Sequence, residues 1–285
     1  MNRFIKNGEN EKTDKTILRI EPALTIRICK DEESSWDTIW KWTWHSRREW
    51  MKNAWREKRE ALSPALEFLS GTGVKTILDC TCGLGYTAVL LAKEGYITHG
   101  SDASSAVEYA PVLAKEKGMK LRFFRSRWEE LQRKVPARYD CIISDYFDEA
   151  PTISCIRNSA RAIHSVLNEG GIFIFGAMNP RITDLKKLVE QEWKNKSGTG
   201  SYPVSRHEGL EVNALEITAK ENNGISDTRI FLVRGKEGLA IEVAKIMNPR
   251  IVFDFRTYSA ALRETGFRKI TSVNDKGRFL NIAFK

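Results

Sequence analysis

Two glycines and an aspartate in the first half of the sequence have the types and spacing of a nucleoside-binding turn. Gly83 and Gly85 follow an apolar run at residues 76–79 and precede a helical pattern at residues 86–94. Because glycine has no side chain, a ligand can approach the backbone of such a strand–turn–helix closely. Asp102 ends the next apolar run, where its carboxylate can accept hydrogen bonds from both hydroxyls of a ribose. The pattern predicts a site for the nucleoside part of a cofactor.

The residues around this turn narrow the choice of cofactor. Ala88 stands where a dinucleotide-binding turn has its third glycine, although some such sites accept alanine. Tyr86 and Thr87 follow Gly85 where a phosphate-binding loop would continue with Lys and Ser or Thr. Asp79, directly before the turn, would repel a pyrophosphate and attract the cationic end of an amino acid. S-adenosylmethionine has a ribose, a sulfonium and an ammonium, so we expect this cofactor.

The order of these motifs resembles that of the class I S-adenosylmethionine-dependent methyltransferases. The resemblance covers roughly residues 56–180 and 256–285, and the motifs that carry it are residues 77–85, Asp102, residues 139–143 and residues 167–171. It implies an α/β fold with a doubly wound, mostly parallel sheet of seven strands. In that fold one strand of the last pair inserts antiparallel into the sheet, which separates it from the dehydrogenases.

Within this class, the sequence is most similar to the glycine and sarcosine N-methyltransferases. Residues 79–85 and 101–104 match that family's Asp-x-x-Cys-Gly-x-Gly and Asp-Ala-Ser motifs. Trp128 matches a tryptophan that packs by the adenine, and Arg59 is placed like the family's basic residue for the cofactor carboxylate. The resemblance thus implies the following cofactor-binding residues: Arg59, Asp79, Cys82, Gly83, Gly85, Asp102, Ala103, Arg127, Trp128 and Ser144.

Two departures from that family concern the substrate. Met178 stands where the family has an arginine for the substrate carboxylate, and Arg181 follows three residues later. Phe147 stands where the family has an asparagine after its fourth strand. These differences argue against glycine as the substrate and leave a small amine as the expected acceptor.

Three polar residues at strand ends are candidates for the catalytic site. Asp145 and Tyr146 close the fourth strand and Asn179 follows the fifth, where α/β sheets place their ligands. A carboxylate or a phenol there can accept or relay an amine proton, although an ordinary polar loop fits the pattern equally well. Residues 145–147 are not the Asn/Asp-Pro-Pro-Tyr/Phe tetrapeptide of many methyltransferases that act on exocyclic amines of bases, which lowers the case for a base as substrate.

Tryptophans and basic residues are interleaved in residues 36–62. This segment has three interpretations: packing of large rings, an aromatic lid that forms a cage for an amine, or stacking on nucleic-acid bases. Acidic residues in the same segment weaken the third. The tryptophans are Trp36, Trp40, Trp42, Trp44, Trp50 and Trp55, and the acidic residues are Asp37, Glu49, Glu57 and Glu60.

The elements that must position these residues alternate between short apolar runs and amphipathic stretches, which predicts a parallel sheet covered on both faces. The expected strands are residues 76–79, 96–101, 121–125, 139–144 and 171–175. The expected helices are residues 86–94, 106–117, 129–134 and 153–167, the last one stopped by the glycines of residues 168–171. Before them, Ser63 and Pro64 have the pattern of a helix start.

Outside this core the sequence predicts added elements. Two β-like runs, at residues 17–20 and 24–29, precede the tryptophan-rich segment. A helix at 183–194 leads into an antiparallel meander of runs 211–218, 228–233 and 238–246, and a helix at 257–264 precedes a hairpin of residues 268–273 and 278–284. We therefore expect four segments: residues 1–62 with the lid, 63–182 as the cofactor-binding core, 183–250 as the inserted substrate-side meander, and 251–285 completing the core.

The composition excludes several classes of protein. Of the 285 residues, 41% are hydrophobic and 29% charged, which does not fit a disordered or low-complexity chain. No apolar stretch approaches a membrane span and the first residues lack a signal core, so we expect a cytoplasmic protein without membrane contact. The 5 cysteines and 4 histidines lack the spacing of a disulfide framework or a metal site. The formal charge of +9 favours anionic partners.

Together these features predict a methyltransferase that moves the methyl group of S-adenosylmethionine to a small-molecule nucleophile, most simply an amine nitrogen. One alternative is an RNA methyltransferase acting on tRNA, because the chain is basic. Another is a protein that binds the cofactor for chemistry other than methyl transfer. The sequence leaves open the acceptor, the number of methyl groups transferred and whether identical chains associate.

Overall fold

The computed structural model describes residues 15–19, 24–176, 178–181, 184–196, 198–221, 224–250, 253–275 and 278–285. Contacts divide the chain into two compact units. The antiparallel unit consists of Met1–Lys52 and Gln191–Pro249, and the α/β unit consists of Asn53–Glu190 and Arg250–Lys285. The predicted division into four segments remains a prediction. Residues 1–14 and 20–23 of the expected first segment, and residues 222–223 and 276–277 of two expected turns, lie outside the described residues.

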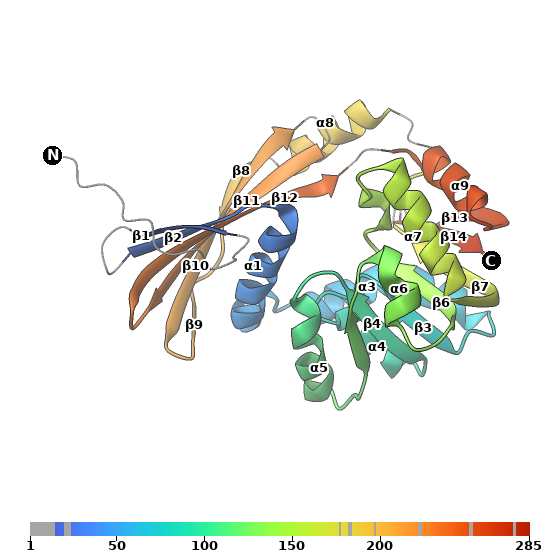
Figure 1. Ribbon diagram of the computed structural model, residues 1–285, viewed down its shortest axis with the longest axis horizontal. Helices are drawn as coiled ribbons and strands as arrows, with labels where there is room; N and C mark the ends of the chain where they lie inside the picture. Colours follow the sequence, from blue (N-terminus) through green and yellow to red (C-terminus); the bar gives the residue numbers. More distant parts are fainter. Residues whose placement is uncertain are drawn as a thin grey trace. The chain divides into compact units, whose positions relative to one another are not determined.

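The sheet of the α/β unit has the expected seven strands (Figure 1). Their order is β13-β14-β7-β6-β3-β4-β5. The first five along the chain pair in parallel, and β14 pairs antiparallel with both β7 and β13. The strands are β3 (Thr76–Asp79), β4 (Ile97–Asp102), β5 (Arg122–Arg125), β6 (Tyr139–Ser144), β7 (Leu167–Phe175), β13 (Lys269–Asp275) and β14 (Arg278–Phe284). The prediction of a mostly parallel, seven-stranded α/β fold is confirmed.

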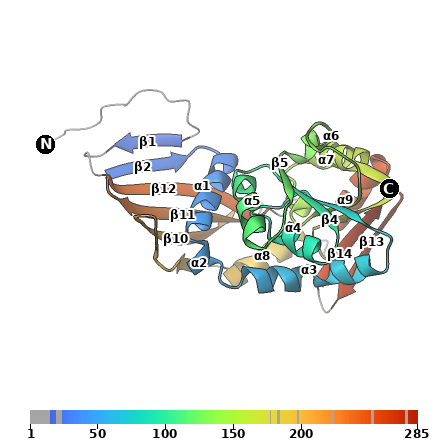
Figure 2. The same cartoon turned by 90° about the horizontal axis from the view of Figure 1, so that it is seen from below.

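Helices cover both faces of this sheet, with α3 on one side and α6 and α7 on the other (Figure 2). Neighbouring residues of a strand point to opposite faces. Accordingly Ile77 belongs to the core with α3 and α4, whereas Leu78 belongs to the core with α7 and α9. The helices are α3 (Ala54–Ser70), α4 (Tyr86–Lys93), α5 (Ala106–Glu116), α6 (Leu131–Lys134), α7 (Ile153–Ser165) and α9 (Phe255–Glu264). Two buried faces explain why the strands read as continuous apolar runs.

The predicted helix start at Ser63 is wrong, because α3 runs from Ala54 to Ser70 with Pro64 inside it. Proline lacks the N–H that would bond to the carbonyl of Glu60. The hydroxyl of Ser63 donates to that carbonyl oxygen instead, at 2.9 Å, and Nη1 of Arg278 also donates to it. These two donors satisfy the carbonyl group that proline leaves unpaired, so the helix continues.

The predicted glycine stop after the fourth helix of the core is also wrong. Helix α7 ends at Ser165, and β7 already begins at Leu167. Gly170 has a φ of 72° within β7, and a Cβ on Gly171 would lie 2.8 Å from the carbonyl oxygen of Asn168. The glycines therefore serve a tight bend at the start of the strand rather than a helix end.

The antiparallel unit contains the predicted meander and four further strands (Figure 1). Its order is β1-β2-β12-β11-β10-β8, with β9 also paired to β10. The strands are β1 (Lys15–Arg19), β2 (Leu24–Cys29), β8 (Gly198–Ser201), β9 (Ser205–His207), β10 (Leu210–Glu221), β11 (Gly224–Gly235) and β12 (Gly238–Arg250). The two N-terminal runs thus extend the inserted sheet, because β2 pairs in parallel with β12.

Most of the tryptophan-rich segment lies in helices of this unit, α1 (Glu32–His45) and α2 (Arg47–Trp50). Ile39 and Trp42 are buried against the meander, and Nε1 of Trp42 donates to Oε2 of the buried Glu242 at 3.0 Å. Nε1 of Trp50 donates to the carbonyl oxygen of Pro203 at 2.7 Å. These contacts favour packing for these two rings, and the lid stays a prediction.

Helix α8 (Leu185–Lys196) spans the boundary of the two units. No helix in the described part of the chain is long and apolar enough to cross a bilayer.

Candidate cofactor-binding site

Three carboxylates follow neighbouring parallel strands and meet at one edge of the α/β sheet. Asp79 ends β3 and pairs in register with Gly100 of β4 and Ile143 of β6. Asp102 and Asp145 each come two residues after those partners, so they reach the same edge. Ligands bind at the carboxyl edge in sheets of this kind.

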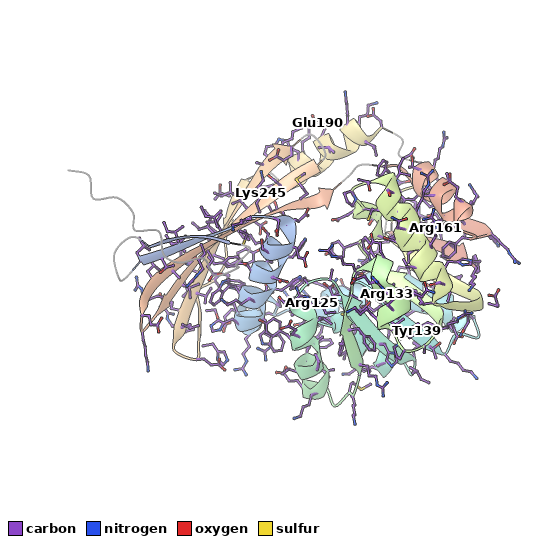
Figure 3. The ribbon with its side chains drawn as sticks, in the orientation of Figure 1. Arg125, Arg133, Tyr139, Arg161, Glu190 and Lys245 are labelled. Carbon is purple, nitrogen blue, oxygen red and sulfur yellow. The ribbon has the colours of Figure 1, made fainter. Side chains whose placement is uncertain are left out.

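Asp102 is fixed by three hydrogen bonds. Its Oδ2 accepts from the backbone N of Gly83 at 2.8 Å, and its Oδ1 accepts from N and Oγ of Ser104 at 2.9 and 2.6 Å. The carboxylate therefore ties the glycine turn to the end of β4, which brings together the residues that the sequence singled out. Next to it, the carbonyl oxygen of the exposed Ala103 accepts from Nε of Arg125 at 3.1 Å. Figure 3 labels Arg125, the last residue of β5.

Asp79 is an almost completely buried acid, with 2% of its surface exposed. Its Oδ1 accepts a 3.3 Å hydrogen bond from the N of Thr81, but its Oδ2 has no hydrogen-bond partner among the described residues. Burial, followed by the charge of Asp145, raises the pKa of Asp79 well above its usual value. A buried carboxylate oxygen without a donor suits a cationic ligand group, which would supply both a hydrogen bond and a charge.

Lys58, which the sequence analysis missed, supplies the positive charge at this edge. Its Nζ lies 3.9 Å from Oδ2 of Asp145. Burial opposes the charge on Lys58, but Asp145, Tyr146 and Asp79 outweigh it and raise the pKa of Lys58 above its usual value. The structure does not bring Arg59 to these acids, since its Nη1 pairs with Oε1 of Glu94 at 3.2 Å.

The helical period of α3 separates these two neighbours. Lys58 lies four residues before Leu62, which is buried together with Ala65 and Leu69 on one face of the helix. Arg59 is turned about 100° away from Lys58. The spacing of the apolar residues in the sequence would have placed Lys58, not Arg59, on the inward face.

The glycine turn itself is tightly packed. Cys82 is buried, and its N donates to the carbonyl oxygen of Ser101 at 3.0 Å. The hydroxyl of Thr81 accepts from the N of Asp145 at 3.1 Å, which joins this turn to the end of β6. Ser144, the last residue of β6, is fully buried beneath it. Thr81 was not predicted, although it belongs to the motif.

Trp128 lies beside the turn. Its Nε1 donates to the carbonyl oxygen of Cys80 at 3.1 Å. Its ring packs edge-on against the ring of Phe147, with 5.3 Å between the two centroids. Phe147 is fully buried among aromatic residues, so it belongs to the core. Arg127 is exposed. The position of Trp128 is compatible with the predicted adenine contact, which remains a prediction.

The three catalytic candidates occupy two loops at this edge. Tyr146 is 43% exposed. Partial burial of its hydroxyl group is the main reason why its pKa lies above the usual value. Asp145 faces Lys58, as described above. Asn179 accepts a 2.9 Å hydrogen bond from the N of Arg181, and the hydrogen bonds of the described residues connect it to neither Asp145 nor Tyr146. In the described part of the chain, no group of three or more His, Cys, Asp and Glu residues could hold a metal ion.

We expect Gly85→Ala to destabilise the fold by about 2–3 kcal/mol, because the change adds both backbone strain and crowding. Gly85 has a φ of 89°, and its Cβ would lie 3.0 Å from Cβ of Ala110 and 3.1 Å from Cε1 of Phe123. Urea unfolding measures the loss. Gly95→Ala is the matched control, because Gly95 has a φ of 97° and open space around it. Equal losses in both variants would show that crowding at Gly85 is unimportant.

Comparisons with known proteins agree with this geometry. A model of the methyltransferase-domain family matches residues 72–223, so the chain belongs to that family. Its domain is a class I S-adenosylmethionine-dependent methyltransferase domain, with S-adenosylmethionine as the cofactor.

Curated relatives match this domain only in part. A carboxy-S-adenosyl-L-methionine synthase of Campylobacter curvus is 28% identical over 53% of this chain and 66% of its own length. A glycine/sarcosine/dimethylglycine N-methyltransferase of Actinopolyspora halophila is 29% identical over 44% of this chain and 23% of its own length. The chain therefore spans less than two thirds of either relative, and the predicted N-methyltransferase family is one of several partial matches.

Solved structures share the fold at low identity. A methyltransferase from Clostridium acetobutylicum has a TM-score of 0.57 at 16% identity, over 79% of this chain and 91% of that chain. An amino pentose methyltransferase from Micromonospora echinaspora has a TM-score of 0.53 at 17% identity, over 82% and 96% of the two chains. These similarities show the architecture of the chain.

Proposed function

We propose that the protein transfers the methyl group of S-adenosylmethionine to an amine nitrogen of a small molecule. The observation that carries this proposal is the buried Oδ2 of Asp79, beside the glycine turn that Asp102 fixes, for which the described residues supply no hydrogen-bond partner. A carboxylate in this position favours a cofactor with a cationic amino-acid end over a dinucleotide or a triphosphate.

Three side chains of the site would hold the cofactor. Asp102 would accept hydrogen bonds from the ribose hydroxyls, and Asp79 would pair with the ammonium group. Lys58, the cation at this edge, would pair with the carboxylate of the cofactor. When bound, the cofactor supplies a methyl group on a sulfonium that is already a good leaving group. The protein then has to align the acceptor and keep water away.

The loop after β6 favours an amine as acceptor. Asp145, Asp148 and Glu149 follow that strand within five residues, so the loop attracts a cationic group. An ammonium group must lose a proton before its nitrogen can accept a methyl group, and in this proposal Asp145 would take that proton. Tyr146, whose raised pKa keeps it neutral, would accept or relay a hydrogen bond. The names of the N-methyltransferase and the amino pentose methyltransferase among the similar proteins support the same class of acceptor.

The test is transfer of labelled methyl groups to paired acceptors. The full chain is incubated with methyl-labelled S-adenosylmethionine and with amines, including amino sugars, each matched by the compound that has a hydroxyl in place of the amine. We expect label on nitrogen, located by fragment masses. Label on oxygen only, on tRNA only, or in a product formed without methyl transfer would contradict the proposal.

We expect Lys58→Met to weaken cofactor binding about tenfold, because the variant removes the cation that faces the acids and the cofactor carboxylate. Calorimetric titration with S-adenosylmethionine measures the change. Arg59→Met is the matched control on the neighbouring residue, and its affinity should stay within about twofold of the wild type. A larger loss of affinity in Arg59→Met than in Lys58→Met would show that Arg59 binds the cofactor carboxylate.

A further inference from the structure

A cavity in the α/β unit is lined by none of the acids of the candidate cofactor site. Its volume is about 400 Å³, within the range of small-molecule sites. Residues of α3, α4 and the end of α5 form it: Trp55, Arg56, Arg59, Leu90, Lys93 and Lys117. We call it the α3–α4 pocket.

Lys93 of the α3–α4 pocket and the cofactor turn lie at different ends of α4, whereas the pocket's Trp55 contacts Tyr86 at the end next to the turn. This helix begins directly after Gly85 of the cofactor turn, and Lys93 is its last residue, about 12 Å along the helix axis. On α3, Lys58 faces the acids of the cofactor site, whereas Arg59 lines the pocket. A ligand of the pocket therefore meets a different set of charges.

Four of the six residues that line this pocket are basic: Arg56, Arg59, Lys93 and Lys117. Arg59 pairs with Glu94 at 3.2 Å, and Arg56 approaches Glu60 at 4.0 Å. Among the described residues, neither of the two lysines that line the pocket has an acidic partner within 4.0 Å. Like charges around a concave surface repel each other and focus the potential toward an anion. The arrangement therefore favours an anionic ligand.

The apolar part of the pocket adds a surface for a planar ring. The ring centroids of Trp55 and Tyr86 are 4.5 Å apart. Nζ of Lys117 lies 4.8 Å from the Trp55 ring centroid. A base that stacked on Trp55 would free the Lys117 ammonium for a phosphate. Leu90 extends the apolar wall.

We propose that the α3–α4 pocket binds a nucleotide, with its phosphate among the lysines and arginines and its base against Trp55. Phosphate oxygens are the preferred partners of such a cation cluster, and base–aromatic stacking adds affinity whatever the base. A free nucleotide and an unpaired nucleotide at the end of a strand share this chemistry. The proposal gives the C-terminal part of the tryptophan-rich segment a role independent of methyl transfer.

The experiment measures binding directly, by calorimetry on the full chain with S-adenosylmethionine in excess so that the cofactor site is occupied. The probes are uridine monophosphate, inorganic phosphate and a short oligouridylate, at about 50 and 200 mM salt. We expect uridine monophosphate to bind more tightly than phosphate and both to weaken with salt. If uridine monophosphate binds as tightly as the oligouridylate, the natural ligand is a free nucleotide. If the oligouridylate binds at least about tenfold more tightly, the ligand is the end of a nucleic-acid strand.

Variants then locate the binding. The double change Lys93→Glu and Lys117→Glu should lower the affinity for uridine monophosphate at least about tenfold. Lys134→Glu with Lys186→Glu is the control, because it changes the net charge equally at two exposed residues outside the pocket. Trp55→Leu should reduce the affinity for the nucleotide to that for phosphate. No binding to the wild type, or equal losses in both double variants, would overturn the proposal.

Discussion

Replacing Asp102 with alanine is expected to weaken binding of S-adenosylmethionine about 100-fold. Two effects combine: the ribose hydroxyls lose a charged acceptor, and the N of Gly83 loses the 2.8 Å bond that holds the turn. A hydrogen bond to a charged group contributes about 1.5–3 kcal/mol, so the loss of the ribose contact in a loosened turn corresponds to about 100-fold. Calorimetric titration of the folded variant gives the dissociation constant.

Two controls separate these effects. Asp102→Asn keeps an acceptor for Gly83 and should lose only about tenfold, because its amide oxygen carries no charge. Glu108→Ala removes an exposed acid on the neighbouring helix, which pairs with Arg125 at 3.4 Å, and should leave affinity within about twofold. If Asp102→Ala binds the cofactor like the wild type, the ribose is held elsewhere.

Replacing Asp79 with asparagine is expected to lower cofactor affinity about 100-fold and to abolish a proton release on binding. In the free protein the raised pKa of Asp79 favours its protonated form. An ammonium group stabilises the ionised form, so binding lowers the pKa and expels a proton wherever the free acid is still protonated. Affinity of the wild type should therefore rise with pH until the pH passes the raised pKa of Asp79.

Titrations in two buffers of different ionisation enthalpy count the protons released. The wild type should release up to about one proton below the raised pKa of Asp79, and Asp79→Asn none. Asp145→Asn is an informative second variant, since Asp145 lies at the same edge but pairs with Lys58. A proton release that persists in Asp79→Asn, or an affinity that falls as pH rises, would show that another group faces the ammonium.

The sequence predicted the α/β core well because its signals are local. The side chains of residues 76–79 and 139–144 point alternately to two buried faces, so apolar residues follow one another in both segments. The strands predicted from these apolar runs have the same bounds as β3 and β6. The turn at Gly83 and its partner Asp102 were recognisable for a similar reason, since both lie at strand ends where glycine and acid types carry the chemistry.

Other features depended on contacts between residues far apart in the chain. The helix passes through Pro64 because Arg278 helps to satisfy the carbonyl of Glu60. The N-terminal run at residues 24–29 had no predicted role because its partner, β12, lies more than 200 residues later. Lys58 is a different case, because the family motif points to its neighbour Arg59, whereas the buried face of α3 places Lys58 inward.

The pairing of β2 with β12 also constrains how the chain folds during synthesis. Leu24 pairs with Leu239, and Trp42 reaches Glu242, so both ends of this sheet must have left the ribosome before either can be buried. The α/β unit waits even longer, because β14 completes its sheet at residues 278–284. Until β12 has left the ribosome, the apolar side of α1 is exposed to other nascent chains, and we expect this stretch to be where chaperones engage the growing polypeptide.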